Sequence, residues 1–268
     1  MKTIVFTGGG TGGHVYPGIA VAEKLKALLE ERGEREAGEY RIVWLGSAGG
    51  MEEEILSRFG IPFYGIPSGK LRRYFSFRNF IDIGKVFAGY GASLSLLRRL
   101  NAALVFSKGG FVTVPPVAAA RTLGIPSLTH ESDLDPGLAT KLNARFADRV
   151  LCAYDETAKK SALSKKSLVT GNPVRSELFA GDRKTGRKIL GIAEKSPIVL
   201  VLGGSQGARQ INRMIDEIRE SLLERAAVVH QTGALDYPMY ERKAVAGRYV
   251  PAAGFTDDFP HVLAAADL

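Results

Sequence analysis

The residues of this chain that could do chemistry gather at glycine-rich stretches. The first stretch, TGGGTGGHVYPG, runs over residues 7–18 and contains a G-x-G-x-x-G pattern at Gly8, Gly10 and Gly13. Glycine adopts positive φ readily and lets a ligand approach the backbone closely, and the free N–H groups at the start of a helix favour anions. The stretch therefore predicts a site for an anionic ligand.

The surrounding sequence argues against a nicotinamide or flavin dinucleotide as that ligand. A dinucleotide loop requires an acidic residue about 20 positions further on, at the end of the second strand, to bind the ribose. Here the second expected strand ends in WLGSAGG, and the next carboxylate is Glu52. The glycines are not followed by a Lys-Ser or Lys-Thr pair either, so the pattern is not that of a P-loop.

His14 directly follows these glycines and is a candidate general base. An imidazole at the tip of a glycine loop, over the edge of a sheet, could accept a proton from a substrate hydroxyl near neutral pH. The alternative is a purely structural histidine, which is the more common role of a lone histidine.

Two further glycine turns follow later strands. SKGGFVTVPP places Gly109 and Gly110 between a strand and a helix, where they form either an anion-binding turn or simply a tight turn. GGSQGARQIN begins at Gly203 and adds the hydroxyl of Ser205 and the amide of Gln206. Together with open backbone N–H groups, these polar groups suit a diphosphate.

The stretch THESDLDPG carries His130, Glu131, Asp133 and Asp135 at the end of an expected strand. Adjacent residues on a strand face opposite sides, so His130 and Glu131 are not expected to share a metal ion. Asp133 or Asp135 is also a candidate cap for the helix expected at PGLATKL.

The elements that must position these residues are short apolar runs alternating with amphipathic helices. The expected strands of the first part are residues 3–7, 41–46, 61–66, 102–107, 125–130 and 149–154, and the first helix is expected over 17–33. The segment 167–186 breaks this rhythm, and the pattern restarts at PIVLVL, continuing with AAVVHQTG and RYVPAAGF. The pattern predicts an α/β fold of two doubly wound parallel sheets, in a first domain of residues 1–172 and a second of residues 173–268.

Composition describes a soluble globular protein of a reducing compartment. The 268 residues are 45% hydrophobic and 24% charged, and Cys152 is the single cysteine. The opening MKTIVFTGGG does not have the form of a secretory signal, and no apolar run approaches the ~20 residues that span a bilayer.

The net charge of +8 lies entirely in the first part of the chain. Residues 1–175 hold 24 Lys and Arg against 16 Asp and Glu, whereas the remaining residues hold 12 of each. Between Lys70 and Arg99, seven basic residues face one acidic residue, with phenylalanines between them. Such a block predicts an anionic partner, unless the phenylalanines belong to the core and the charges are merely solvated.

Taken together, these stretches resemble the MurG family of glycosyltransferases. The matching segments, in the family's order, are GGGTGGHVYPGIAVA, VFSKGGFVTVPPVAAA, HESDLDPGLATKLNARFAD, GNPVR and GGSQGARQIN. The resemblance implies a GT-B fold, in which two Rossmann-like domains face a cleft. It also implies inverting transfer of GlcNAc from UDP-GlcNAc to the MurNAc 4-hydroxyl of undecaprenyl-linked lipid I, giving lipid II for peptidoglycan synthesis. Neither a cofactor nor a metal ion is expected, and no nucleic acid is an expected partner.

The resemblance also assigns roles to residues. It implies that His14 and Glu131 are catalytic, with His14 as the base. The acceptor diphosphate is expected at Gly10, Gly13, His14, Gly109 and Gly110. The donor UDP-GlcNAc is expected at Thr11, Gly12, Gly13, Asp133, Arg175, Ser205, Gln206 and Thr256, although some family members carry Asn where this chain has Asp133.

The basic segment resembles the family's membrane-docking surface. Its expected membrane-facing residues are Lys70, Arg72, Arg73, Phe75, Phe77, Arg78 and Phe80. Cations and aromatic side chains would attach the protein reversibly to the anionic cytoplasmic face of the cell inner membrane. The implied localisation is therefore peripheral.

After AAADL the family continues with a strand, a turn and a helix that hold the donor. We therefore expect these 268 residues to lack much of the donor site and to be impaired in activity alone.

Two alternatives to this function stay open. One is a different GT-B lipid glycosyltransferase, for example one that acts on diacylglycerol. The other is a membrane-recruiting binding module whose catalytic half is on another chain.

Overall fold

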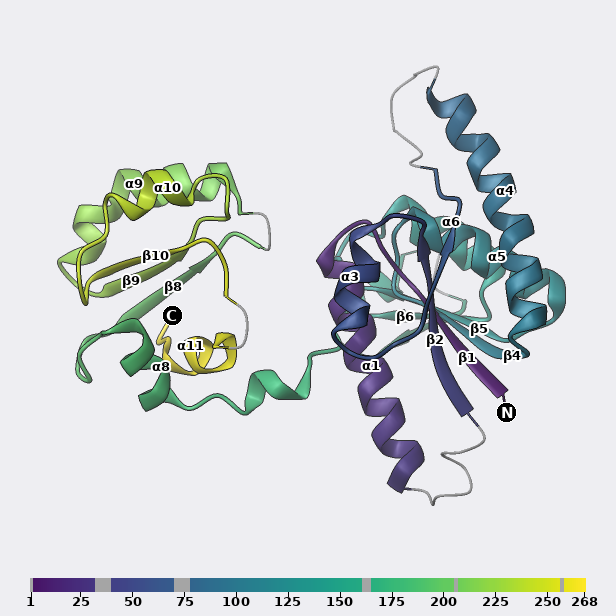
Figure 1. Ribbon diagram of the computed structural model, residues 1–268, viewed down its shortest axis with the longest axis horizontal. Helices are drawn as coiled ribbons and strands as arrows, with labels where there is room; N and C mark the ends of the chain where they lie inside the picture. Colours follow the sequence, from purple (N-terminus) through teal and green to yellow (C-terminus); the bar gives the residue numbers. More distant parts are fainter. Residues whose placement is uncertain (1, 32–39, 70–77, 161–164, 205–206, 256–257) are drawn as a thin grey trace. The chain divides into compact units, whose positions relative to one another are not determined.

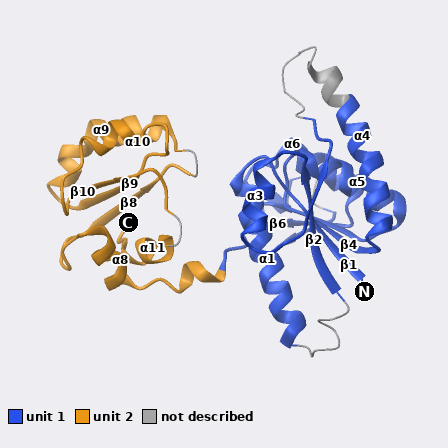
Figure 2. Cartoon of the chain, in the orientation of Figure 1, with its two compact units in different colours: residues 1–175 blue, residues 176–268 orange. Residues whose placement is uncertain are grey.

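The computed structural model describes residues 2–31, 40–69, 78–160, 165–204, 207–255 and 258–268. The chain divides into two compact units, residues 1–175 and residues 176–268 (Figure 2). Each unit contains a parallel sheet with helices on both of its faces (Figure 1). The α/β fold class expected from the sequence is confirmed.

Unit 1 is built on a sheet of seven parallel strands in the order β3-β2-β1-β4-β5-β6-β7. The strands are β1 (Lys2–Thr7), β2 (Tyr40–Ser47), β3 (Phe63–Ile66), β4 (Ala102–Ser107), β5 (Ser127–Glu131), β6 (Arg149–Cys152) and β7 (Ser167–Val169). The chain order reverses between β1 and β4, and such a switch point leaves a crevice at the carboxyl ends of the strands.

Helices cover both faces of this sheet because the side chains of the strands alternate. On β1, Ile4 and Phe6 pack with Ile19, whereas Val5 packs with Val117 on the opposite face. The first face carries α1 (Gly12–Glu31) and α3 (Met51–Ser57), and the second carries α4 (Arg78–Arg99), α5 (Val114–Leu123) and α6 (Leu138–Phe146). The short elements η1 (Phe111–Thr113) and α7 (Asp155–Ala158) complete the unit.

Helix α1 begins at Gly12, five residues before the expected start at Pro17. The N–H of His14 donates to the carbonyl of Thr11 at 3.1 Å, which closes the first turn. Gly12, Gly13 and His14 therefore belong to the helix, and the expectation that His14 lies at the tip of a loop is wrong. Pro17 sits inside the helix, where its missing N–H leaves one backbone bond unmade near the N-terminus.

Unit 2 is built on three parallel strands in the order β10-β9-β8. These are β8 (Ile198–Leu202), β9 (Ala227–Gln231) and β10 (Tyr249–Ala252). Helices α8 (Arg183–Leu190) and α11 (Phe259–Ala265) pack on one face, and α9 (Arg209–Leu223) and α10 (Tyr237–Glu241) on the other. The turn η2 (Ser176–Phe179) precedes α8. Backbone groups of Asp267 and Leu268 bond to Ile198 and Leu200 along the edge of β8 that does not face β9.

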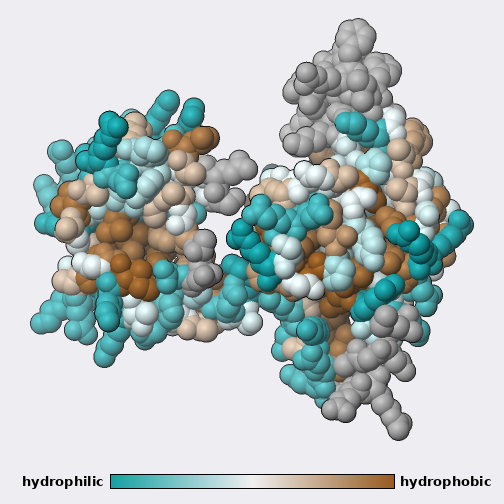
Figure 3. Space-filling model, in the orientation of Figure 1, coloured by the Kyte–Doolittle hydropathy of each residue, from teal (hydrophilic) through white to brown (hydrophobic). Residues whose placement is uncertain are grey.

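Apolar side chains reach the surface of both units, as Figure 3 shows for one face of the molecule. Exposed examples are Phe87 in unit 1 and Leu235 in unit 2. Within the described part of the chain, no helix is both long and apolar enough to cross a membrane. Because both units expose apolar side chains, surface hydropathy alone does not indicate which unit would contact a membrane or a partner.

Candidate functional site

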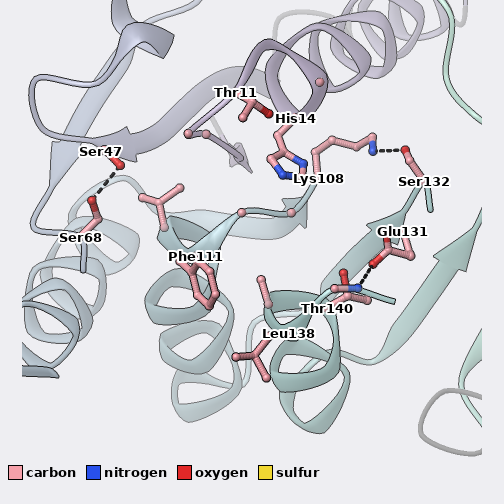
Figure 4. A pocket seen from close by; sticks show the side chains of 18 of the residues that line it. Thr11, His14, Ser47, Ser68, Lys108, Phe111, Glu131, Ser132, Leu138 and Thr140 are labelled. Atoms are coloured by element: carbon pink, nitrogen blue, oxygen red, sulfur yellow. Dashed lines mark hydrogen bonds between the residues drawn. The ribbon is translucent and has the colours of Figure 1, made fainter. Parts of the chain in front are cut away.

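A cavity of about 720 Å³ opens in unit 1 where the chain leaves β1, β4 and β5 (Figure 4). This is the carboxyl edge of the sheet, at the switch point between β1 and β4, where open α/β sheets bind ligands. Residues from the segments 9–14, 108–112 and 131–140 line it, together with Ser47, Ser68 and Gly69. The cavity brings the first glycine stretch, the SKGG turn and the HESD stretch together in one place.

The His14 imidazole lies against the turn formed by Gly109 and Gly110. A β-carbon at Gly109 would stand 3.1 Å from His14 Nδ1, and a β-carbon at Gly110 would overlap the carbonyl oxygen of Gly9. Both glycines also have positive φ, at 105° and 87°. Only glycine satisfies both requirements, so this turn depends on its two glycines for its close approach to the first glycine stretch.

A buried side-chain amide of helix α6 forms hydrogen bonds on both sides of the same turn. Asn143 on α6 is fully buried and donates to the hydroxyls of Ser107 at 3.1 Å and Thr113 at 2.7 Å. Ser107 ends β4, and Thr113 ends the short helix η1 that follows the turn. Both ends of the Gly109 turn are thereby tied to α6.

Charge and burial set the protonation of His14. Burial lowers its pKa below the ordinary histidine value, and the neighbouring ammonium of Lys108 lowers the pKa further. The Lys108 backbone, Glu131 and Asp133 act in the opposite direction, but the pKa remains lowered. The imidazole is therefore neutral near pH 7 and able to accept a proton.

Lys108 is a residue of the cavity that the sequence interpretation did not single out. It is only 1% exposed, and its Nζ donates to Ser132 Oγ at 2.6 Å. Burial lowers the pKa of this lysine, whereas Glu131 and Asp133 raise it. The only signal for Lys108 in the sequence is its position directly before Gly109. Lysines are almost never fully buried, so the sequence alone gives no reason to expect that this one is.

The Glu131 carboxylate forms hydrogen bonds with the backbone of the loop that follows it. Glu131 is 6% exposed, and its carboxylate accepts hydrogen bonds from the N–H groups of Asp133 at 3.0 Å and Gly137 at 2.9 Å. Gly137 is the N-cap of α6, and no side chain caps that helix. The expectation that Asp133 or Asp135 caps α6 is therefore wrong, because Glu131 reaches across the loop to the N-cap backbone. Asp135 is instead exposed and pairs with Lys160.

His130 leaves β5 on the face opposite Glu131, as adjacent strand residues must. Its Nε2 bonds with the carbonyl of Gly171 at 2.9 Å. Burial, with help from the charge of Lys108, lowers the pKa of His130 to about 4. His130 does not line the His14 cavity, and the described residues contain no cluster of three potential metal ligands.

The other expected ligand residues are distributed unevenly. Gly10, Thr11, Gly13 and Asp133 line the cavity, whereas Gly12 is buried inside the first turn of α1 and does not. Arg175 is also absent from the lining, and its guanidinium lies 4.7 Å from the ring centre of Tyr16.

Several expected site residues lie outside the described residues or lack a described side chain. Outside are Lys70, Arg72, Arg73, Phe75, Phe77, Ser205, Gln206 and Thr256. Arg78 and Phe80 lie in α4, but their side chains are not described. In the turn after β8, Gly204 and Gly207 both have a φ of 78°. A β-carbon at Gly207 would overlap the carbonyl oxygen of Thr232, so this turn also needs glycine.

The fold and the site together define an α/β protein of two parallel-sheet units with a cavity at the carboxyl edge of the first sheet. The chain belongs to glycosyltransferase family 28. The N-terminal domain of that family matches residues 4–152, and its C-terminal domain matches residues 198–268.

Two curated relatives share the name UDP-N-acetylglucosamine–N-acetylmuramyl-(pentapeptide) pyrophosphoryl-undecaprenol N-acetylglucosamine transferase. The protein from Treponema denticola is 50% identical over 243 residues, which cover 87% of this chain and 60% of the relative. The protein from Lachnoclostridium phytofermentans is 41% identical over 270 residues, which cover 100% of this chain and 72% of the relative. The chain thus spans about 60% of the length of the Treponema denticola relative.

The chain is also similar to the crystal structure of MurG from Acinetobacter baumannii. The TM-score is 0.64 at 25% sequence identity, covering 95% of this chain and 67% of the solved one. The resemblance to the MurG family and the GT-B fold expected from it are confirmed by these likenesses and by the two family domains.

Proposed function

We propose that this protein transfers GlcNAc from UDP-GlcNAc to the MurNAc 4-hydroxyl of undecaprenyl-linked lipid I, giving lipid II and UDP for peptidoglycan synthesis and, through it, for cell shape and division. The observation that carries the proposal is His14, whose pKa is lowered and which lies in a cavity bounded by two glycine turns. Identity of 50% to a transferase of that name supports the substrates.

In the proposed reaction His14 accepts the proton of the MurNAc 4-hydroxyl as its oxygen attacks the anomeric carbon of GlcNAc. The bond from that carbon to the diphosphate of UDP breaks, and the configuration at the carbon inverts. A neutral imidazole suits this step, since a protonated one could not accept the proton. Gly10, Gly13, Gly109 and Gly110 are proposed to accommodate the acceptor diphosphate, because they leave the backbone accessible beside His14.

The donor is proposed to meet unit 1 at the opening of the same cavity. Thr11 and Asp133 line it, and Glu131 holds the loop that presents Asp133. Gly12, Gly13, Arg175, Ser205, Gln206 and Thr256 remain proposed donor contacts. As UDP leaves, oriented N–H groups would stabilise the charge that develops on it.

We further propose that residues 70–87 dock on the anionic cytoplasmic surface of the cell membrane. The charge excess of the chain lies in the part that contains this segment, and Phe87 on α4 is 72% exposed. Because apolar surface occurs on both units (Figure 3), the charge is the feature that favours unit 1. Each cation near an anionic membrane contributes roughly 1 kcal/mol.

The test of the transferase proposal is an assay with labelled UDP-GlcNAc and either lipid I or diacylglycerol as acceptor. Lipid I should be converted to lipid II with release of UDP, and His14→Gln should lower the rate by about 10²–10⁴-fold, as expected for loss of a general base. Trp44, the single tryptophan, donates to the Gly8 carbonyl at 2.9 Å, so its emission checks that the variant keeps the glycine stretch folded.

Acceptor binding is measured on the same chain through Trp44 emission. The chain should bind a short-chain lipid I analogue, and Gly109→Ala should weaken that binding. Both results together would support the assignment of the cavity to the acceptor, even where turnover is slow. Transfer to diacylglycerol but not to lipid I, or failure of the chain to bind the lipid I analogue, would contradict the proposal.

A further inference from the structure

A single ammonium group is buried in the wall of the His14 cavity. Lys108 directly follows β4, and its side chain runs beside the His14 ring toward the loop after β5 (Figure 4). Its Nζ ends on the hydroxyl of Ser132 at 2.6 Å. A charge in this position acts on whatever titratable group lies next to it, because the surroundings screen it less than water does.

Within the described ranges, no direct ion pair cancels the positive charge of Lys108. Among the described residues, no carboxylate comes within 4.0 Å of its Nζ. Glu131, the nearby buried carboxylate, already accepts two backbone N–H groups. A buried lysine normally pairs with an anion, and pairing with a neutral hydroxyl leaves its charge available to its neighbours.

The loop that anchors Lys108 is itself fixed. Glu131 holds the N–H groups of Asp133 and Gly137. Thr157 donates to the carbonyl groups of Asp133 at 3.1 Å and Leu134 at 3.0 Å. Ser132 lies inside this network, so its hydroxyl holds Nζ at a set place beside His14.

We propose that Lys108 is a positioning residue for His14, whose ammonium, anchored on Ser132, holds the imidazole in the neutral form that takes the proton of the acceptor hydroxyl. The identity of that hydroxyl rests on the proposed function, whereas the effect of Lys108 on His14 does not. Among the residues that the structure describes, the charged groups that act on His14 are Lys108 after β4 and Glu131 and Asp133 after β5. The two carboxylates favour the imidazolium, whereas burial and, after it, the charge of Lys108 oppose it.

The direct test is the pH titration of the four histidines by NMR in the chain labelled with ¹³C-histidine. In Lys108→Met the His14 midpoint should rise by about one pH unit, because the opposing charge is gone while Glu131 and Asp133 remain. Lys108→Gln is the second neutral variant and should show the same rise. His230 and His261 of unit 2 are internal references, and their midpoints should not move.

Ser132→Ala is the matched control, since it removes the hydrogen bond but keeps the ammonium. Because the ammonium remains but loses the hydroxyl that holds it, the His14 midpoint of this variant should rise by clearly less than that of Lys108→Met. An unchanged His14 midpoint in a folded Lys108→Met or Lys108→Gln chain would overturn the proposal. So would a rise in Ser132→Ala as large as that in Lys108→Met, because loop position rather than charge would then be responsible.

The pH dependence of transfer provides the second measurement. The acid limb of kcat/KM for lipid I should move to higher pH in Lys108→Met by the same amount as the NMR midpoint. In Ser132→Ala it should move by clearly less. An NMR shift without a matching kinetic shift would overturn the role of Lys108 in the reaction. Absence of transfer in the parent chain together with a shifted His14 midpoint would count against the proposed function alone.

Discussion

Glu131 illustrates how a carboxylate at a strand end can organise a site through the backbone. The sequence placed it at the end of an expected strand, and the resemblance implied a catalytic role. The structure engages both of its oxygens with N–H groups of the loop that ends at Gly137. Glu131 therefore fixes the path of the loop that carries Asp133.

We expect Glu131→Ala to destabilise unit 1 by about 2–3 kcal/mol, because it leaves two N–H groups without their charged acceptor. Urea unfolding followed by Trp44 emission measures this, since Trp44 is fully buried in unit 1. The matched control is Asp135→Ala in the same loop, whose exposed pairing with Lys160 contributes little. Equal shifts of the unfolding midpoint in the two variants would contradict the role assigned to Glu131.

At the residue scale, the sequence named the glycines, His14 and Glu131 as site residues because their types and positions after strands are informative. The role of Lys108 could be identified only from the structure. A lysine after a strand is normally solvated, and whether its ammonium is buried depends on which loops pack around it. Here Ser132, from a loop about two dozen positions further along the chain, forms the contact that holds it.

At the scale of elements, α1 and β2 meet through a contact that requires glycine. A β-carbon on Gly18 would overlap the ring of Trp44. Trp44 in turn holds the carbonyl of Gly8, so the glycine stretch, the helix and the strand are packed as one group. The early start of α1 at Gly12 and the close approach at Gly18 together place His14 over the sheet edge.

Gly18→Ala should therefore lower the stability of unit 1 by about 1–3 kcal/mol, although alanine is the better helix former. Gly91→Ala in α4 is the matched control, because a β-carbon there would meet no atom within 4 Å. That control should be neutral or stabilising by up to about 1 kcal/mol. Circular dichroism and Trp44 emission during urea unfolding give both values, and equal stability of the two variants would refute the packing argument.

The strands and main helices followed from the alternation of apolar runs, and the misses have identifiable causes. Strand β7 has three residues, of which Leu168 and Val169 are exposed, so it has no buried apolar run. Helix α8 begins inside the segment 167–186, whose glycine, proline and charged residues indicated a break between two domains. Its apolar face is small, and its packing on α11 supplies what the local sequence lacks.

At the scale of the whole molecule, the charge distribution separates the two parts of the chain. Residues 1–175 carry the whole net charge of +8, and residues 176–268 are neutral. An anionic surface would therefore attract unit 1 in preference to unit 2.

We expect the chain to bind vesicles that contain phosphatidylglycerol, to bind pure phosphatidylcholine vesicles poorly, and to dissociate as salt rises. Replacing Arg72 and Arg73 by Glu should weaken binding at least about tenfold, because each cation near the surface contributes roughly 1 kcal/mol. Vesicle co-sedimentation measures this. Arg98→Glu with Arg99→Glu, in the last turn of α4, changes the net charge equally and should have a smaller effect. Equal losses of binding in the two variants would indicate attraction by net charge without a docking segment.

The sequence by itself determined the α/β class, the glycine turns, the opposite orientation of His130 and Glu131, and the family. Each of these depends on local pattern or on motifs read in order. The tertiary structure alone decided that the residues after β1, β4 and β5 share one cavity, that Lys108 is buried beside His14, and that Glu131 holds a loop. These outcomes depend on strand order, in which Thr7 pairs with Ser107 across about a hundred residues of chain. Local periodicity specifies a strand and its faces, but the neighbours of that strand are chosen by packing of the whole sheet.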